Sequence, residues 1–513
     1  MKRFEIYATI CAVVAVISAC KREISIPETF ESTDELALLV PDYKNIACPY
    51  NIAPLNFKTA NEGQKCIAEI KGMHATYITE ADKRGMFSFD IKTWKALLAS
   101  HKSDTLTFNL YIKRDKQWRR LRPFYIYVAP EPVDSFLTYR LIEPGYLSFR
   151  QMSICQRDLT SFDVKTLYDN HAQASDETNA CVNCHNFQHY GTERAMLHVR
   201  VKNSGTVIYD KGKFSKVKFP TDSIPYGASY PAWHPSKPWI VFSSNLTGQS
   251  FHINHDEKVE VSDIASDLLF YDEKGTIQYV MRTDNVLETF PTWHPDGKRL
   301  YYTAASVPVL DSLPKEDNEA YIISHYKDLK YDIMYVDFDE ETRTFGAPQK
   351  LLDCAAEEKS ASLPRVSPDG RYLLYTLADY GQFHIWHDTA DLWICDLQAD
   401  SLAAHPLKEA NAYGSDSYHS WSSNGRWIAF SSRRDDGSYT RIYLTYFDRM
   451  GKAHKAFMIP QADPEQDIFL LKSYNVPELT RASCAFSEEA LRQAIESPDA
   501  KEVIYTPQKR IQP

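Results

Sequence analysis

The chain has 513 residues, with 68 acidic against 58 basic side chains and a formal net charge of −10. No run of Lys and Arg stands out, which argues against nucleic acid and anionic membrane surfaces as partners. With 32 Tyr and 25 Phe but only 18 Gly, the composition is typical of a β-rich fold packed by aromatic side chains, and the length allows two or three domains.

The amino terminus, 1–20, has the pattern of an export signal. Lys2 and Arg3 precede an apolar stretch, 6–18, that is too short to span a bilayer, and small residues lead to Cys20. The pattern resembles a bacterial lipoprotein signal, in which Cys20 carries the lipid; an ordinary cleaved signal peptide is the alternative. Both predict export. We expect a periplasm-facing protein in the cell envelope of a Gram-negative bacterium, with the lipid as its one membrane contact.

Residues 21–45 are acidic and contain Pro and Ser, which predicts a tether leading into a first strand at 36–40. From 46 to 133, short segments alternate polar and apolar residues and predict a small β-sandwich-like domain with one helix at 92–100. Cys48 and Cys66 are the one disulfide pair that their closeness in sequence favours. Residues 134–196 are predicted to be a connector.

This connector contains Cys181-Val182-Asn183-Cys184-His185. Cys-x-x-Cys-His is the pattern of covalent c-type haem attachment: two thiols, expected one helical turn apart, bond to the vinyl groups, and the adjoining imidazole ligates the iron. Export supports this interpretation, because bacteria attach c-type haem outside the cytoplasm. The sequence therefore predicts one covalent haem c.

Other uses of the cysteine pair stay open. Cys181 and Cys184 could hold zinc together with two histidines or a distant cysteine, or they could form a structural disulfide. A thioredoxin-like redox pair is disfavoured, because 176–179 is polar where that motif requires an apolar strand.

Candidates for the second axial ligand follow the motif. Met196 and His198 are two residues apart on a predicted strand, so both project from one face and either could ligate the iron. Arg200, on the same face, is predicted to pair with a haem propionate. His171 and His189 are further candidates.

From about residue 195 the sequence is repetitive. Four similar segments, three of them with an Asp-Gly or Asn-Gly turn, each run into an apolar strand: 230–243, 290–303, 363–376 and 418–431. A third strand follows each copy, as in Asp332-Ile333-Met334-Tyr335. A hairpin plus a third strand, repeated at intervals of roughly 60 residues, is typical of a propeller blade.

The repeats resemble those of TolB-like (PD40-type) β-propellers. The resemblance covers 197–475 and implies a mainly β chain with a C-terminal six-bladed propeller over 197–480, in which two degenerate blades lie around 199–209 and 468–474. Residues 481–513 are predicted to add one helix, at 487–497, and a tail.

Some histidines belong to this repetitive part. His234 and His294 recur at equivalent places, which indicates a structural role, whereas His384, His387 and Asp388 could line one mouth of the propeller. No Gly-x-Ser-x-Gly motif is present and only some 40 residues follow the last blade, so a hydrolase domain is not expected.

Together these features predict an exported lipoprotein with one haem c and a protein-docking propeller. Its expected role is electron transfer or redox sensing at the envelope, with an electron donor or acceptor and another envelope protein as partners. The alternative is a non-redox envelope scaffold in which Cys181 and Cys184 form a disulfide or hold zinc.

Overall fold

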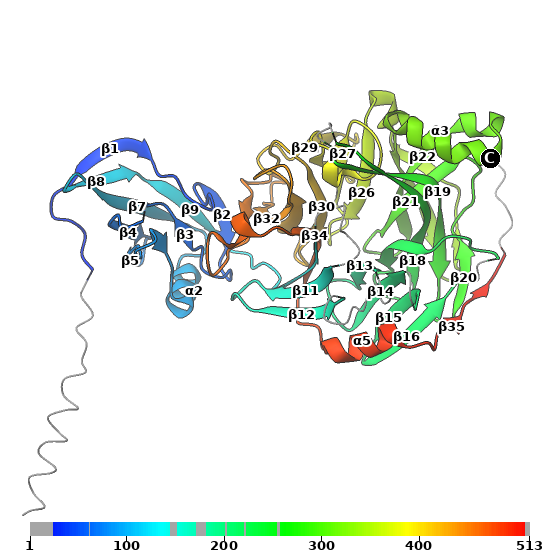
Figure 1. The fold of residues 1–513 in the computed structure, drawn as a ribbon, viewed down its shortest axis with the longest axis horizontal. Coiled ribbons are helices and arrows are strands. Elements are labelled where there is room, and N and C mark those ends of the chain that lie inside the picture. Colours follow the sequence, from blue (N-terminus) through cyan, green and yellow to red (C-terminus); the bar gives the residue numbers. More distant parts are fainter. Residues whose placement is uncertain are drawn as a thin grey trace, which may run out of the picture.

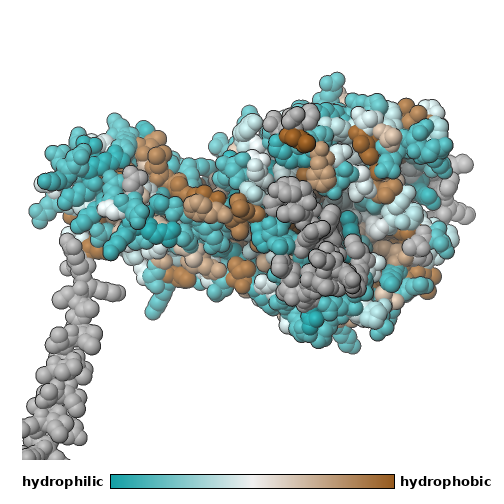
Figure 2. Space-filling view, viewed as in Figure 1, coloured by the Kyte–Doolittle hydropathy of each residue, from teal (hydrophilic) through white to brown (hydrophobic). Residues whose placement is uncertain are grey.

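The computed structural model describes residues 24–60, 62–143, 151–170, 181–200, 203–219, 222–253 and 257–507, without the side chains of Cys181, Asn183 and Cys184. The chain is mainly β and forms two bodies side by side, a small N-terminal domain and a larger ring of sheets (Figure 1). The visible surface is mostly hydrophilic, with apolar side chains gathered near the waist between the bodies (Figure 2). None of the described helices is long and apolar enough to cross a membrane.

The N-terminal domain has one large sheet rather than two matched layers. Its strands are β1 (Glu31–Leu36), β2 (Ile46–Pro49), β4 (Cys66–Lys71), β5 (Thr76–Glu80), β7 (Asp104–Arg114), β8 (Gln117–Arg122) and β9 (Phe124–Ala129); β3 (Phe57–Lys58) and β6 (Met86–Phe87) form a separate pair. The first strand was predicted at 36–40. It lies earlier, at Glu31–Leu36 within the expected tether, because β1 pairs in parallel with β8 there.

The predicted helix of this domain is confirmed as α2 (Ile91–Ser100). Asp90 begins it: its carboxylate accepts a hydrogen bond from the Thr93 N–H at 2.8 Å, which satisfies one of the free donors of the first turn. Trp94 and Leu98 are buried against the sheet in the core of the domain. The predicted Cys48–Cys66 disulfide is wrong, since both thiols are buried and free.

Six sheets form the ring, and we number these blades by the order of their innermost strands. Blade 1 is β13 (Cys181–Phe187), β14 (Arg194–Arg200), β15 (Gly205–Asp210), β16 (Lys213–Lys218) and β35 (Lys501–Glu502). Blade 2 is β17 (Ala228–Trp233), β18 (Ile240–Phe251), β19 (Val259–Tyr271), β20 (Thr276–Tyr279) and β36 (Ile504–Tyr505). Blade 3 is β21 (Val286–Trp293), β22 (Arg299–Ser306), β23 (Asp332–Asp339), β24 (Thr344–Phe345) and β25 (Gln349–Leu352).

The other three blades complete the circle. Blade 4 is β26 (Ser360–Val366), β27 (Tyr372–Ala378), β28 (Asp391–Asp396) and β29 (Ala404–Pro406). Blade 5 is β30 (Asp416–Trp421), β31 (Trp427–Ser432), β32 (Arg441–Tyr446) and β33 (Phe457–Met458). Blade 6 is β34 (Ser473–Thr480), β10 (Phe136–Ile142), β11 (Met152–Asp158) and β12 (Val164–Asp169). The prediction of a six-bladed propeller is therefore confirmed.

Blade 6 closes the ring with strands from both ends of the propeller sequence. Its inner strand β34 pairs antiparallel with β10, and β34 also contacts the neighbouring inner strands β30 and β13. The predicted connector thus contains three strands of a blade, β10, β11 and β12. The predicted degenerate blade at 199–209 consists of parts of β14 and β15 in blade 1.

The repeated tryptophans explain why the blades stack in register. At the end of three inner strands, an indole N–H donates to a backbone carbonyl of the preceding inner strand. The pairs are Trp233 to Asn186 (3.3 Å), Trp293 to Ala232 (3.2 Å) and Trp421 to Arg365 (3.1 Å). Each indole ring also packs in an apolar cluster between blades. One tryptophan per repeat therefore buries apolar surface and, through its directional hydrogen bond, fixes how the neighbouring blades are oriented.

The repeated histidines also join neighbouring blades. The ring Nε2 of His234 lies 3.2 Å from the carbonyl oxygen of Gly297, and that of His294 lies 3.2 Å from the carbonyl oxygen of Gly370. Both glycines have positive φ, at 76° and 74°, in the Asp-Gly turn of the next blade. This is the structural role that the repetition predicts.

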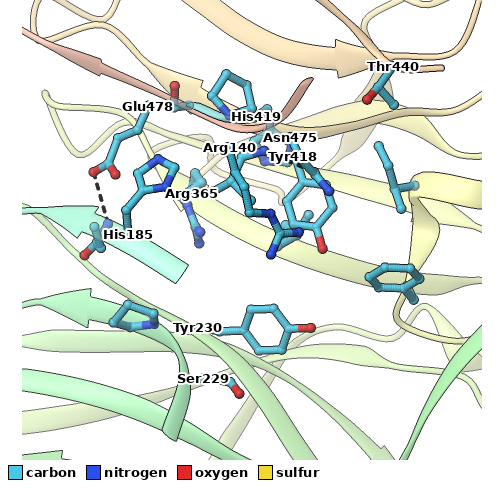
Figure 3. Close-up of a pocket in the computed structure, with 18 of the residues that line it drawn as sticks. Arg140, His185, Ser229, Tyr230, Arg365, Tyr418, His419, Thr440, Asn475 and Glu478 are labelled. Atoms are coloured by element: carbon cyan, nitrogen blue, oxygen red, sulfur yellow. Dashed lines mark hydrogen bonds between the residues drawn. The ribbon is translucent and has the colours of Figure 1, made fainter. Parts of the chain in front are cut away.

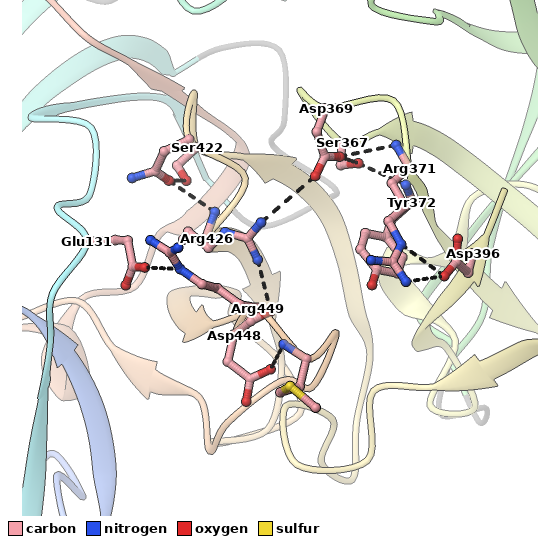
Figure 4. A network of polar contacts seen from close by, with 12 residues as sticks. Glu131, Ser367, Asp369, Arg371, Tyr372, Asp396, Ser422, Arg426, Asp448 and Arg449 are labelled. Carbon is pink, nitrogen blue, oxygen red and sulfur yellow. Dashed lines mark hydrogen bonds and ion pairs between the residues drawn. The ribbon is translucent and has the colours of Figure 1, made fainter. Parts of the chain in front are cut away.

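The N-terminal domain packs against blade 5. The Glu131 carboxylate pairs with Arg449 at 3.0 Å and accepts a hydrogen bond from the Tyr446 hydroxyl at 2.7 Å, and its backbone carbonyl accepts one from the Trp427 indole at 3.2 Å. Figure 4 shows the Glu131–Arg449 pair beside the Arg426 and Arg371 pairs of blades 4 and 5. A continuous apolar core shared by the domain and blade 5 fixes the two bodies to each other.

Small helices complete the fold. The chain also has α3 (Asn318–Ser324), α4 (Gln466–Phe469) and α5 (Glu488–Glu496). The predicted C-terminal helix is confirmed as α5, whose N-cap Ser487 accepts a hydrogen bond from the Ala490 N–H at 3.2 Å. Leu491 and Ile495 of α5 pack into the core between blades 1 and 6.

Candidate functional site

A cavity of about 800 Å³ lies at the centre of the ring and is lined by inner strands from all six blades. Four of the lining residues, Tyr230, Leu363, Tyr418 and Val476, occupy one equivalent position, a bulge in the inner strand with positive φ between 41° and 54°. A bulge re-aims a side chain out of the normal strand alternation, so it can turn one residue per blade towards the ring centre. Figure 3 shows Tyr230 and Tyr418 at this cavity.

The Cys-x-x-Cys-His motif occupies the same bulge in blade 1. The register of β13 shifts between Asn183 and Asn186, as that of β17 shifts between Ser229 and Ala232 and that of β30 between Ser417 and Ser420. By this alignment, Cys184 takes the strand position of Tyr230, and His185 takes that of Pro231 or His419. The motif is therefore the inner-strand repeat of blade 1, in a bulged strand rather than the expected helical turn.

Among the cysteines and the histidine of this motif, His185 is the residue whose side chain the structure describes. The imidazole is 4% exposed and lines the central cavity, and its Nε2 has no hydrogen-bond partner among the described residues. Burial, and then the charge of Arg140, lower its pKa to about 4. At neutral pH the ring is uncharged, the form that can bind a metal.

His419 is an internal comparison for His185. It takes the same strand position in blade 5 and is also buried, and burial lowers its pKa to about 3. Its Nδ1 lies 3.5 Å from the Thr376 hydroxyl, and its Nε2 lies 3.3 Å from the Leu374 carbonyl oxygen. A histidine here can thus be held by the protein alone. The backbone of Thr138 and Val476 acts on the His185 ring as well, but its Nε2 has no hydrogen-bond partner among the described residues.

The structure does not bring the predicted second ligands to His185. Met196 is fully buried between blades 1 and 2, in an apolar cluster with Ile240 and Trp233. His198 also faces blade 2: its Nδ1 lies 3.0 Å from the Thr206 hydroxyl, and its Nε2 lies against Gly227. His185 instead faces blade 6, beside Thr138 and Val476. Neither predicted ligand therefore has geometric support.

Other predicted residues are placed as follows. Arg200 lines the cavity and donates to the Ser229 hydroxyl at 2.5 Å. His189 lies at the cavity rim with positive φ, and is exposed. Cys20 and His171, together with the side chains of Cys181 and Cys184, lie outside the described part of the structure.

The loop histidines between β27 and β28 do not line the cavity: His384 is held within blade 4, and His387 joins blade 4 to blade 2. His384 accepts or donates to Ser362 Oγ at 2.8 Å. The Nε2 of His387 lies 2.6 Å from a carboxylate oxygen of buried Glu260, on an extension of the β18–β19 hairpin. Through this pair the hairpin of blade 2 reaches across to blade 4. Among the described residues, no three His, Cys, Asp or Glu side chains are placed to hold a metal ion.

The cavity carries positive charge. Arg140, Arg200, Arg365, Arg433 and Lys258 line it, and the carboxylate of Glu143, also on its wall, is paired with Lys472 at 3.0 Å. The carboxyl of Glu478 lies among them and accepts hydrogen bonds from the Phe187 N–H at 2.9 Å and the Asn186 amide at 3.0 Å. Burial raises its pKa to about 8, so it is largely protonated at neutral pH and does not neutralise the arginines. Sequence reasoning missed Arg140, Arg365 and Glu478, because distant segments supply them.

No family model and no curated protein matches the chain. Among solved structures, TolB from Acinetobacter baumannii is similar at 13% identity and a TM-score of 0.41, over 76% of this chain and 85% of that one. A putative TolB from Agrobacterium tumefaciens is similar at 13% identity and a TM-score of 0.36, over 66% and 96%. A putative 6-phosphogluconolactonase from Bacteroides uniformis is similar at 10% identity and a TM-score of 0.32, over 78% of this chain and 98% of that one. With scores this low, the fold rests on the strand order described above.

Proposed function

We propose that the protein is an exported propeller with one c-type haem in its central cavity, bound through Cys181 and Cys184 and ligated by His185, and that it transfers electrons or senses redox state at the envelope. Its predicted anchor is a lipid on Cys20. The observation that carries the proposal is the buried His185 imidazole, which lines a large cavity and whose Nε2 has no hydrogen-bond partner among the described residues.

Two further features of the cavity support a tetrapyrrole ligand. Its volume of about 800 Å³ is that of a site for a large organic ligand, and its walls combine aromatic side chains such as Tyr230 and Trp386 with arginines. Haem presents a flat apolar ring and two carboxylates, which matches this combination. When bound, haem supplies one-electron transfer. The residues of the chain would hold the ring, orient it through His185 and exclude water.

The mouth of the cavity offers a place for a redox partner to dock. The extended β18–β19 hairpin lines the cavity and exposes Phe251 and Ile253, at 57% and 91% of their surface, near its tip. Exposed apolar side chains beside a cavity mark a contact surface for another protein. An electron donor or acceptor that docks here would approach the haem.

The test is covalent haem attachment. The mature chain is expressed with a cytochrome c maturation system, and haem is detected after denaturation on a gel. We expect wild type to retain haem and both Cys181→Ala and Cys184→Ala to lose it. His185→Ala should alter the absorption spectrum, whereas the matched variant His419→Ala should leave it unchanged. A haem-free wild type, with zinc or a disulfide at the cysteine pair, would establish the non-redox binding scaffold instead.

A further inference from the structure

Arg140 lies on β10, lines the central cavity and forms no ion pair with the described carboxylates. The carboxylate of Glu143, which also lines the cavity, pairs with Lys472 at 3.0 Å instead. The Nε of Arg140 is buried and has no hydrogen-bond partner among the described residues. Leaving such a donor and its charge unpaired is costly, so a counter-ion is expected beside it.

Arg365, on β26, points into the same space. One of its guanidinium nitrogens donates to the carbonyl of Pro364 at 2.8 Å, and the carboxyl group that acts on its charge is Glu478. That carboxyl is largely protonated at neutral pH, because burial raises its pKa to about 8. In Figure 3, Arg140 and Arg365 both extend towards the open space that faces Tyr230.

The other two arginines of the cavity are already engaged. Arg200 donates to the Ser229 hydroxyl at 2.5 Å. Arg433 donates to the carbonyl oxygens of Ile385 and Ser438, and its guanidinium lies 3.3 Å from the centre of the Trp386 ring. These partners are neutral, so the cavity keeps its positive charge, and Arg140 and Arg365 are the two arginines that extend into the open space in Figure 3.

We infer that Arg140 and Arg365 form a carboxylate-binding site in the central cavity, which takes the acid groups of a planar aromatic dicarboxylate. Guanidinium groups recognise carboxylates by short, charge-assisted hydrogen bonds, and the aromatic walls accept a flat ring. If the ligand is the haem proposed above, these two residues hold its propionates in place of the predicted Arg200. The identification of the ring as haem rests on that proposed function, whereas the carboxylate site does not.

The first experiment tests carboxylate binding in a chain that cannot attach haem covalently. The full mature chain with Cys181→Ala and Cys184→Ala is titrated with metal-free mesoporphyrin IX, a planar dicarboxylate, and with its uncharged dimethyl ester, by fluorescence. We expect Arg140→Gln and Arg365→Gln each to weaken binding of the diacid by about ten- to a hundredfold. Binding of the ester should stay unchanged, which shows that the cavity is folded. Arg200→Gln is the matched control inside the cavity, and Lys at either position should restore part of the affinity.

The second experiment identifies the source of the carboxylates. In the chain that keeps Cys181 and Cys184 and carries attached haem, Arg140→Gln and Arg365→Gln should each lower the reduction potential, because a positive charge is lost beside the haem. If haem never attaches but the diacid still binds through both arginines, the ligand is a free aromatic acid; the carboxylate site then stands while the haem function fails. Equal binding of diacid and ester by the wild-type cavity, or diacid binding that neither arginine variant weakens, would overturn the inference.

Discussion

Glu478 should make the stability of the protein fall with rising pH. Its carboxyl accepts hydrogen bonds from the Phe187 N–H and the Asn186 amide, and burial raises its pKa from 4.5 to about 8. Between these two values the folded state binds a proton that the unfolded state has lost. The contribution of the group to stability is therefore fully present below pH 4.5 and is lost as the pH rises through 8.

The size of this effect follows from the displacement of the pKa. At about 1.4 kcal/mol per pH unit, the move from 4.5 to about 8 corresponds to at most about 5 kcal/mol. The side chain is partly exposed, so solvent screening reduces the expected value to about 2 to 4 kcal/mol. Glu478→Gln keeps an oxygen that can accept both hydrogen bonds but cannot ionise. The variant should equal wild type near pH 4.5 and exceed it in unfolding free energy by this amount at pH 9.

The assay is urea unfolding of haem-free protein, followed by tryptophan fluorescence, at pH 5, 7 and 9 for wild type and Glu478→Gln. The quantity of interest is the difference between the two proteins at each pH, because other groups titrate in both. Glu489→Gln is the control: this carboxyl is exposed on α5, and its hydrogen bond with Arg492 lowers the pKa. A Glu478→Gln difference that does not change with pH would show that the carboxyl is ionised in the folded protein and refute the reasoning.

Two further predictions concern the ring itself. Ending the chain after residue 472 removes β34, so the cooperative thermal transition should be lost, whereas ending it after 507 should preserve the transition in calorimetry; a normal transition without β34 would contradict the closure of the ring by this strand. Trp427→Ala should lower the unfolding free energy by about 3 to 5 kcal/mol in urea titration, because the fully buried ring joins blade 5 to the N-terminal domain through the Glu131 carbonyl. A loss below 1 kcal/mol would contradict that role.

The repetitive blades could be predicted because their signals are local. Each of the copies at 230, 290, 363 and 418 holds its turn, its bulge and its strand within about 20 residues, so composition and spacing suffice. The repeated His234 and His294 were predictable as structural positions for the same reason. Their hydrogen bonds to the neighbouring blade explain why they recur.

Blade 6 could not be predicted in the same way. The pairing of Phe136–Ile142 with Ser473–Thr480 joins segments more than 300 residues apart, and the hairpins of this blade lack the Asp-Gly turn of the other copies. A signal for its inner strand was present: Asn475-Val476-Pro477 follows the same bulge pattern as Ser229-Tyr230-Pro231. The same comparison aligns Asn183-Cys184-His185 with both. It would have placed the motif in an inner strand instead of a connector.

The candidate site is a consequence of ring closure. His185 comes from blade 1 and Arg365 from blade 4, whereas Arg140 and Glu478 come from the two segments that close blade 6. No segment of the sequence contains more than one of these four residues, so no local pattern can reveal the charge around the imidazole. The hydrogen bond from the Phe187 N–H to Glu478 ties the closing strand β34 directly to the motif strand β13. An open ring would therefore lose both the cavity and its arginines, even though the Cys-x-x-Cys-His sequence would be intact.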